Sequence, residues 1–272
     1  MIGIVDLSGG FGNHLFLYSL GLYLKKNGIK VYFYNPEKKY YIDPSLFNFR
    51  KLENIKYSSL EIYKKLNKIH KNYKKISLDE VAKNNFNIEK IFLDKKIISF
   101  NGYFQNYLIV NENLEELKKI LLDISKDYKI NETDDTTNTM VHVRRSDYVN
   151  IGEQLDINYY KKAISYCQEN IKNFNFNVFT DDYEWVKSQS IFKDANKIEN
   201  SLDIEKRIEK NVLTTFFEMM NYKNFIISNS TFSWWSAILG SDNNSVVTCP
   251  EPFFRNEKSD LTLDKWVIFP RE

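Results

Sequence analysis

The sequence predicts an α/β protein built from two parallel-sheet units, and three observations lead to this fold class. Short apolar runs alternate with helical segments along most of the 272 residues. Such alternation is typical of β-α-β units, in which a helix connects two parallel strands. The polar stretch 131–138 contains no apolar residue and separates two series of this kind, as a linker would. We therefore expect an N-terminal domain at 1–130 and a C-terminal domain at 131–272.

The first series begins with an apolar run at 2–7, which predicts a buried strand. A glycine-rich turn at 8–13 follows, then an apolar helix at 15–26 and a second strand at 30–34. This order of strand, turn, helix and strand indicates a parallel sheet. Beyond it, residues 43–125 are rich in lysine and read as mostly helical, with one strand-like stretch at 96–100.

The second series alternates more regularly. Its apolar runs predict strands at 139–143, 176–180, 225–228 and 245–249, and the segments between them predict helices at 159–170, 183–190, 207–222 and 231–239. Two α/β halves joined by a polar linker favour a cleft in which a small ligand binds. In open α/β sheets ligands bind beyond the carboxyl ends of the strands, so polar residues at those ends are the candidate site.

Composition excludes several classes of protein. The net charge of +2 gives no reason to expect a nucleic-acid partner, and the two cysteines, Cys167 and Cys249, provide neither a disulfide framework nor metal spacing. The first residues reach Asp6 without a basic segment, so they do not read as a signal peptide. No run approaches the ~18 apolar residues of a membrane span. We expect a cytosolic protein.

Positive charge is concentrated near the start of the chain. Residues 1–75 carry 14 Lys plus Arg against 5 Asp plus Glu, and much of the excess lies at 64–75. A solvated helix face explains such a run. The alternative is attraction to an anionic surface, which would place the protein peripherally at the inner face of the membrane, beside a lipid-linked substrate.

The most informative segment is the heptad His142-Val143-Arg144-Arg145-Ser146-Asp147-Tyr148. Only six arginines occur among 38 Lys plus Arg, and two of them stand together directly after the strand at 139–143. A guanidinium fits two phosphate oxygens at once, whereas lysine offers a point charge. Strand alternation puts His142 and Arg144 on one face. The alternative is a surface arginine pair neutralised by Asp147, with His142 simply held in place.

Two further polar clusters follow strands of the second half. Asp181 and Asp182 directly follow the strand at 176–180. There they could cap the next helix or accept hydrogen bonds from a nucleobase or sugar. The segment 228–235 joins a strand to a helix and contains Asn229, Ser230 and Thr231. The amides at such a helix start can bind an anion, although serine or threonine there is also an ordinary cap, and the Trp pair at 234–235 suits a core.

The glycine turn near the start is a fourth cluster. Gly3, Gly9, Gly10 and Gly12 are four of the nine glycines, and glycine allows a close approach of backbone to ligand. The dinucleotide fingerprint is incomplete because Leu15 replaces its third glycine. No Asp-x-Asp pair occurs, so the usual carboxylates for a metal-diphosphate complex are missing. We therefore expect no metal and no cofactor.

These four clusters, in this order, resemble the bacterial and animal α-1,2-fucosyltransferases. The resemblance implies a GT-B-like enzyme with two Rossmann-type domains facing a cleft. The N-terminal domain would be the acceptor side, with its glycine loop over the donor, and the C-terminal domain would bind the GDP-sugar. The enzyme would move L-fucose from GDP-β-L-fucose to a galactoside hydroxyl in surface glycan or O-antigen synthesis, with inversion and without a metal. The resemblance also implies that Arg144 binds the donor diphosphate and is the catalytic cation, that Arg145 assists or braces it, and that His142 orients the group. Further donor contacts are implied or expected at Gly10, Gly12, Asn13, Asp181, Asp182, Asn229, Ser230, Thr231 and Phe232.

The sequence departs from the family at three places. His14 stands where glutamine is common, Ser146 where glycine is common, and Thr215, with Glu218 nearby, where an aspartate is frequent. The general base is not assigned, and the candidates are His14, Asp147, Glu153 and Asp156. Two rival functions stay open, namely a transferase using another GDP-sugar and a non-catalytic module that binds a nucleotide sugar or a glycan.

Overall fold

A computed structural model shows that the chain forms two compact α/β units, Met1–Leu121 and Leu122–Glu272. The structure describes residues 1–35, 40–51, 73–77, 87–92, 97–128, 138–200, 209–256 and 259–272. The division between the units falls within helix α6 (Leu114–Ser125). The expected domain boundary between residues 130 and 131 lies outside the described residues, as do all but the last residue of the linker at 131–138 and most of the lysine-rich stretch 64–75.

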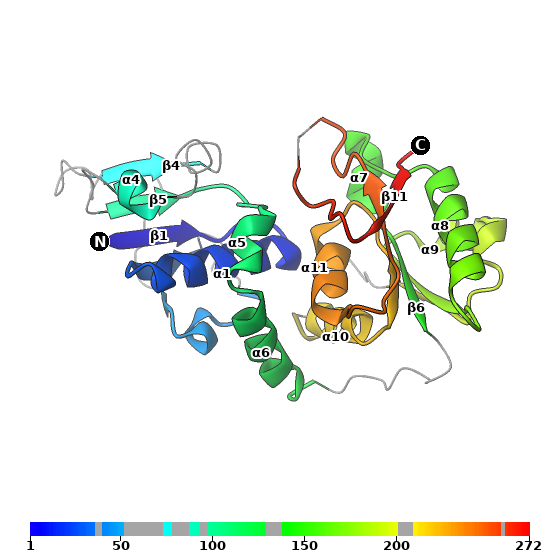
Figure 1. The fold of residues 1–272 in the computed structure, drawn as a ribbon, viewed down its shortest axis with the longest axis horizontal. Coiled ribbons are helices and arrows are strands. Elements are labelled where there is room, and N and C mark those ends of the chain that lie inside the picture. The colour runs from blue at the N-terminus through cyan, green and yellow to red at the C-terminus, as the bar shows by residue number, and fades with distance from the viewer. Residues whose placement is uncertain are drawn as a thin grey trace. The chain divides into compact units, whose positions relative to one another are not determined.

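The sheet of the first unit has five parallel strands in the order β3-β2-β1-β5-β4. Figure 1 labels β1, β5 and β4 of this sheet. They are β1 (Ile2–Asp6), β2 (Lys30–Tyr34), β3 (Arg50–Lys51), β4 (Tyr73–Ile76) and β5 (Ile97–Phe100). The strands predicted at 2–7, 30–34 and 96–100 are confirmed. The prediction of a single strand within 43–125 is wrong, because β3 and β4 add two short strands whose basic residues interrupt any apolar run. The described parts of this stretch also contain helices, and the rest lies outside the described residues.

Helix α1 (Phe11–Lys26) is the main helix of the first unit. Twelve of its sixteen residues are buried, so it is a core helix rather than an amphipathic one. A Cβ atom on Gly21 would lie 2.6 Å from the Phe33 ring, so this glycine lets α1 approach β2 closely. Gly28, at a φ of 75°, ends the helix in the left-handed conformation that favours glycine. The shorter helices of this unit are η1 (Pro44–Phe47), α4 (Ile88–Phe92) and α5 (Tyr107–Asn111).

The sheet of the second unit has six parallel strands in the order β11-β10-β9-β6-β7-β8. They are β6 (Thr139–Val143), β7 (Phe176–Thr180), β8 (Lys197–Asn200), β9 (Asn224–Ile226), β10 (Val247–Glu251) and β11 (Val267–Pro270). The four predicted strands are confirmed, whereas β8 and β11 were not predicted. From β6 the chain adds β7 and β8 on one side. It then returns to the other side of β6 and adds β9, β10 and β11 there. This is the doubly wound order, and its switch point lies between β6 and β9.

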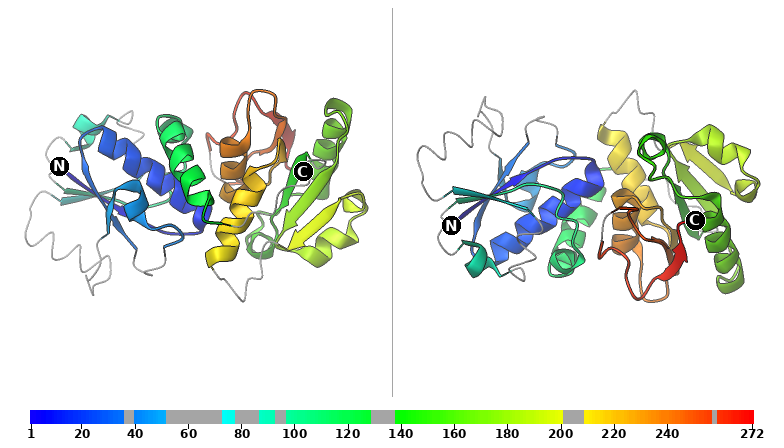
Figure 2. Two further views of the ribbon diagram at one scale, coloured as in Figure 1. Left: turned by 90° about the horizontal axis from the view of Figure 1, so that it is seen from below. Right: turned by 90° about the horizontal axis from the view of Figure 1, so that it is seen from above.

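Helices cover both faces of this second sheet (Figure 2). On one face, α8 (Ile157–Asn170) packs Tyr159 and Cys167 against valines of β6 and β7. On the other face lie α10 (Glu209–Met220) and α11 (Thr231–Gly240), where the rings of Phe216 and Phe232 meet at 5.4 Å. The smaller helices are α7 (Ser146–Ile151), α9 (Tyr183–Ser188) and η2 (Ser190–Phe192).

The pair Trp234 and Trp235 is fully buried in α11, so these side chains belong to the core of the second unit, as the composition of the segment suggested. The helices in the described parts of the chain include none that is long and apolar enough to cross a bilayer.

Candidate functional site

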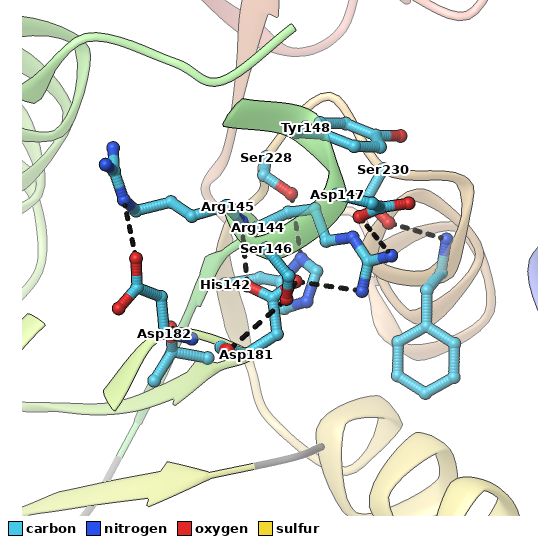
Figure 3. Close-up of polar contacts among 12 residues, drawn as sticks. His142, Arg144, Arg145, Ser146, Asp147, Tyr148, Asp181, Asp182, Ser228 and Ser230 are labelled. Carbon is cyan, nitrogen blue, oxygen red and sulfur yellow. Dashed lines mark hydrogen bonds and ion pairs between the residues drawn. The ribbon is translucent and has the colours of Figure 1, made fainter. Parts of the chain in front are cut away.

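The switch point of the second sheet brings the three predicted polar clusters together. Arg144 and Arg145 follow β6, the aspartates Asp181 and Asp182 follow its neighbour β7, and Ser228 follows β9 on the other side. Since parallel strands end at one edge, all three clusters lie at the carboxyl edge of the sheet, and Figure 3 shows their side chains gathered there. Ligands of doubly wound sheets bind at this position.

Arg144 is the central cation of the site. Its Nη1 lies 3.0 Å from a carboxylate oxygen of Asp181, and its Nη2 lies 2.6 Å from one of Asp147. Its guanidinium also lies over the ring of Tyr148, 5.4 Å from the centroid. An arginine has five N–H donors, and these two ion pairs use two of them. The Arg144 side chain is 24% exposed, so its remaining N–H donors can bind an anionic ligand.

Asp181 fixes the turn that carries both arginines. Its side chain is 1% exposed and accepts hydrogen bonds from the Arg145 backbone N–H and the Ser146 hydroxyl, each at 2.7 Å. With Arg144 added, the carboxylate serves three donors of the β6–α7 turn. These three contacts give Asp181 a bracing role in the turn, and its expected contact with a nucleobase or sugar stays a prediction.

Arg145 points away from Arg144, as Figure 3 shows. Its Nε donates to Asp182 at 3.1 Å, and its guanidinium carbon lies 3.8 Å from the centroid of the Trp185 ring. Asp182 in turn accepts from the Trp185 backbone N–H and caps α9. The helix-cap alternative is therefore confirmed for Asp182. Arg145 is held by one carboxylate and one aromatic face, which suits a brace.

His142 lies behind Arg144 on the same side of β6 and is 4% exposed. Its Nδ1 is 2.8 Å from the Ser228 hydroxyl, which lies 3.4 Å from the hydroxyl of Ser233 in α11. Burial and the neighbouring Arg144 guanidinium lower the pKa of His142 to about 3. The imidazole is thus neutral near pH 7 and links β6 to the start of α11.

The β9–α11 turn provides the other side of the site. Ser230 caps α11 by accepting a hydrogen bond from the Phe232 backbone N–H at 3.3 Å. Thr231 begins the helix, and helix N-termini carry partial positive charge that favours anions. Asn229 is fully buried and donates to the backbone oxygen of Glu153 at 2.8 Å. Asn229 therefore anchors the turn, while Ser230 and Thr231 lie at the sheet edge.

Three of the four candidate bases have defined partners in this unit. Asp147 is 61% exposed and paired with Arg144, as the bracing alternative proposed. Asp156 caps α8 by accepting from the Asn158 backbone N–H at 2.8 Å. Glu153 binds Arg271, Asn229 and the Arg255 backbone N–H. These contacts give Glu153 and Asp156 structural roles.

Glu153 is the centre of a buried polar group that the sequence did not reveal. Arg271 is 3% exposed, and its Nη2 lies 2.9 Å from a Glu153 carboxylate oxygen. Asn229 reaches the same carboxylate, and the Tyr148 hydroxyl donates to the Asn229 backbone oxygen at 3.3 Å. The only sequence signal was the scarcity of arginine, which also applies to Arg271.

Glu218, named for its place near a frequent family aspartate, lies away from this edge. It is buried on α10. Burial raises the pKa of its carboxyl above the ordinary value, and the nearby Lys197 opposes this increase only in part. Lys197 opens β8, and the strand's carboxyl end lies at Asn200. Glu218 therefore faces the opposite end of the strand.

The glycine turn belongs to the first unit. Gly9 has a φ of 77°, and Gly10 is the N-cap of α1 without a side-chain cap. Gly12 and Asn13 lie in the first turn of α1, and Asn13 accepts a hydrogen bond from the Gln105 amide at 2.9 Å. Burial lowers the pKa of His14 to about 4, so its ring, which is 2% exposed, is neutral near pH 7.

No group of three or more His, Cys, Asp or Glu side chains that could hold a metal occurs in the ranges that the structure describes. The predicted metal independence stays a prediction.

Comparison with known proteins places this site in context. A family model described as "Glycosyl transferase family 11" matches residues 5–269. An Escherichia coli alpha-1,2-colitosyltransferase is 35% identical over 187 residues, which cover 64% of this chain and 63% of that protein, so the match spans under two thirds of this relative. The Escherichia coli O-antigen biosynthesis glycosyltransferase WbnK is 28% identical and aligns over 96% of this chain and 98% of its own length.

Among solved structures, a variant of Arabidopsis thaliana FUT1 in complex with GDP aligns with a TM-score of 0.50 at 12% identity, covering 93% of this chain and 72% of that one. At this identity the likeness bears on the fold alone. The predicted GT-B-like α/β fold, with two parallel sheets flanked by helices, is confirmed.

Proposed function

Because the chain belongs to glycosyl transferase family 11, we propose that it moves L-fucose from GDP-β-L-fucose to a galactoside hydroxyl in an α-1,2 linkage. The glycan would be an O-antigen or another surface glycan, and its lipid-linked form would bring the protein to the inner face of the membrane from the cytosol. The lipid link and membrane contact rest on the basic excess in residues 1–75.

The single observation that carries this proposal is the position of Arg144. Its guanidinium stands at the switch point of a doubly wound sheet, oriented by two carboxylates and an aromatic ring, with donors left for a ligand. A diphosphate is the ligand that fits a planar fork of N–H groups next to a helix start. The neutral His142 adds no charge, and it holds the strand end in register with α11 through Ser228.

The chemistry required of the site follows from the bonds that change. The acceptor hydroxyl oxygen attacks the anomeric carbon from the face opposite GDP, and the bond from that carbon to the phosphate oxygen breaks. Its electron pair leaves with GDP, and the hydroxyl proton passes to a base. Negative charge thus grows on the diphosphate. A fixed cation and oriented amides stabilise this charge without reorganising, which is the role we assign to Arg144 and the turn at Ser230 and Thr231.

The other residues predicted to bind the GDP-sugar have different roles in this proposal. Phe232 follows the cap of α11 and lies next to His142, with 6.2 Å between the ring centroids, so it would line the base or ribose side. Arg145, Asp181 and Asp182 brace the arginine turn. The family resemblance assigns Gly10, Gly12 and Asn13 of the first unit to the donor as well.

Another GDP-sugar is the second candidate donor, and one comparison favours it. The relative at 35% identity carries the name alpha-1,2-colitosyltransferase, which shares the proposed linkage but names a different sugar. A panel of GDP-fucose, GDP-colitose, GDP-mannose and a UDP-sugar, with linkage analysis of the product, separates the donors. Turnover of any donor excludes the non-catalytic module, and turnover in EDTA tests metal independence.

The residue assignment is tested by replacing Arg144. We expect Arg144→Ala to reduce donor turnover by ~10²–10³, the usual effect of deleting one donor that stabilises developing charge. Arg144→Lys should recover little, because lysine cannot form the two-pronged contact. The matched control is Arg255→Ala, which removes an exposed arginine paired with Glu272 and should keep wild-type turnover. Wild-type turnover in Arg144→Ala with an unchanged circular dichroism spectrum contradicts the assignment.

A further inference from the structure

A buried ion pair in the second unit is connected to both arms that the proposed function assigns to the diphosphate. The first arm is Arg144, which follows β6, and the second is the start of α11 at Ser230. Glu153 follows the end of α7, and Arg271 follows β11. Arg271 Nη2 lies 2.9 Å from a carboxylate oxygen of Glu153. Two routes of contact lead from this pair to the arms.

The route to α11 passes through Asn229, the residue before Ser230. The Asn229 side-chain amide donates to the Glu153 backbone oxygen at 2.8 Å and to a Glu153 carboxylate oxygen at 3.2 Å. Arg271 Nη2 donates to the same two oxygens, at 2.8 Å and 2.9 Å. Asn229 is fully buried and Arg271 is 3% exposed, so these contacts are shielded from bulk water. Glu153 therefore ties the β9–α11 turn to the end of β11.

The route to Arg144 runs along α7. The Glu153 backbone N–H donates to the Tyr148 backbone oxygen at 2.9 Å and closes the end of this helix. The Tyr148 ring lies below the Arg144 guanidinium, with 5.4 Å between its centroid and the guanidinium carbon. The Tyr148 hydroxyl donates to the Asn229 backbone oxygen at 3.3 Å. Tyr148 thus contacts both arms, and Glu153 is hydrogen-bonded to both ends of this link.

The energetics of the ion pair suit a positioning role better than a stabilising one. Burying two charges costs desolvation that their mutual attraction offsets only partly. Arg271 Nε and Nη1 are also buried and have no hydrogen-bond partner within the described ranges of the chain, and a buried unpaired donor costs free energy. An apolar pair of the same size would avoid these costs, but it could not hydrogen-bond Asn229.

From these contacts we infer that Arg271 and Glu153 are positioning residues of the transferase, which set the spacing between the Arg144 fork and the start of α11. The inference deepens the proposed function and rests on it, because this spacing matters only for a ligand that both arms bind at once. A diphosphate, whose two phosphates share one bridging oxygen, is such a ligand. A misplacement of about 1 Å can cost ~10² in rate, so a small shift of either arm should change turnover.

The test replaces Arg271 in the full chain, with GDP as ligand in calorimetry, GDP-fucose as donor and lactose as acceptor. Arg271→Met should lower kcat by ~10–10²-fold and weaken GDP binding, and it should leave the acceptor KM unchanged. Arg271→Lys should recover most of the loss, because a single nitrogen, Nη2, makes both contacts with Glu153. The control Ile164→Ala opens a cavity in the core beneath α8. It should lower the melting temperature and keep the wild-type kcat at temperatures where it is folded.

A second set of variants determines whether Arg271 acts through Arg144. In an Arg144→Ala background the spacing no longer matters, so adding Arg271→Met should change kcat and the GDP dissociation constant by less than about twofold. A role in stability alone would leave the activity per folded molecule unchanged in both backgrounds. The double variant Glu153→Gln/Arg271→Met leaves no buried charge unpaired, so it should fold even if Arg271→Met does not, with a similar loss of kcat.

The outcomes separate this inference from the proposed function. If the wild-type chain binds no GDP and turns over no GDP-sugar, the proposed function fails and the inference fails with it. If the wild type does both, but Arg271→Met keeps the wild-type kcat and GDP affinity, the positioning role is wrong while the proposed function stands. The double variant decides in the same way where the single one does not fold. An equal fold-loss of kcat with and without Arg144, or an equal loss in Ile164→Ala, also overturns the inference.

Discussion

Two aspartates contact the same arginine, and their different burial predicts different effects on stability. Asp181 and Asp147 lie 3.0 Å and 2.6 Å from the Arg144 guanidinium, yet the Asp181 side chain is 1% exposed and the Asp147 side chain is 61% exposed. We consider Asp181→Asn and Asp147→Asn, which keep the shape of each side chain and remove its charge. The shorter ion pair is the exposed one, so distance alone would rank them in the wrong order.

The expected magnitudes follow from the contacts. Asp181 accepts from the Arg145 backbone N–H, the Ser146 hydroxyl and Arg144. An asparagine keeps one acceptor atom, so two contacts to a charged acceptor are lost, each worth about 1.5–3 kcal/mol. The Ser146 hydroxyl can rotate to accept from the new amide, and Arg144 is partly hydrated. We therefore expect a loss of about 2–4 kcal/mol in unfolding free energy, below the ~3–5 kcal/mol of a fully buried broken pair.

Asp147→Asn should cost ~0–1 kcal/mol, as exposed pairs do. Urea unfolding followed by tryptophan fluorescence reports on the second unit, where all four tryptophans lie, and gives both values in the same buffer. Equal destabilisation by the two variants, or a smaller effect of Asp181→Asn, would refute the reasoning that burial rather than pair distance sets the contribution.

Two further predictions concern titration and backbone conformation. The pKa values of His142 and His14, about 3 and about 4, lie below the ordinary 6.5, so the unfolded chain takes up protons that the folded chain does not. The contribution of these two histidines to the unfolding free energy should be complete above pH 6.5 and should fall below that pH by ~1.4 kcal/mol per pH unit per histidine. Urea unfolding at several pH values should show a shallower dependence of the unfolding free energy on pH for His14→Gln. An unchanged pH dependence in this variant contradicts the prediction. Gly9→Ala should destabilise by at least ~1–2 kcal/mol, because φ is 77° and the new Cβ would meet the Asn13 amide at 2.4 Å, whereas Gly10→Ala meets nothing within 4 Å. Equal melting temperatures of the two alanine variants would contradict the strain argument.

The strands and helices were predictable where hydrophobicity marks them. The strand β6 and the helix α1 are mainly apolar segments, and all residues of β6 and twelve of the sixteen residues of α1 are buried. Strand β8 escaped prediction because its sequence, Lys197–Asn200, alternates charged and apolar residues at the sheet edge and is only partly buried. Strand β4 is also an edge strand, and the lysine pair at 74–75 interrupts its apolar residues in sequence. Edge strands are defined by a neighbour to pair with, and that information is not local.

The site was predictable in position but only partly in role. His142 and Arg144 share a strand face, which follows from alternation alone. Whether Asp181 would cap a helix, meet a ligand or brace an arginine depended on residues 36 positions away. Glu153 likewise could not be recognised as structural, because its partner Arg271 is 118 positions distant. Contacts over such separations depend on the order of strands in the sheet, which local sequence patterns do not predict.

The exposed pairing of Arg144 with Asp147 has a consequence for how quickly and how tightly an anion binds. Two arginines face three aspartates in this group, so its formal charge is −1 and long-range attraction of a nucleotide is weak. Asp147 acts as a counterion that is already in place on Nη2, and a phosphate that binds the remaining N–H donors competes with this carboxylate for the same positive charge. Binding of the phosphate then weakens an existing ion pair instead of neutralising a free cation. Its association rate should depend little on ionic strength, and selectivity for a diphosphate arises from the shape of the fork rather than from accumulated positive charge.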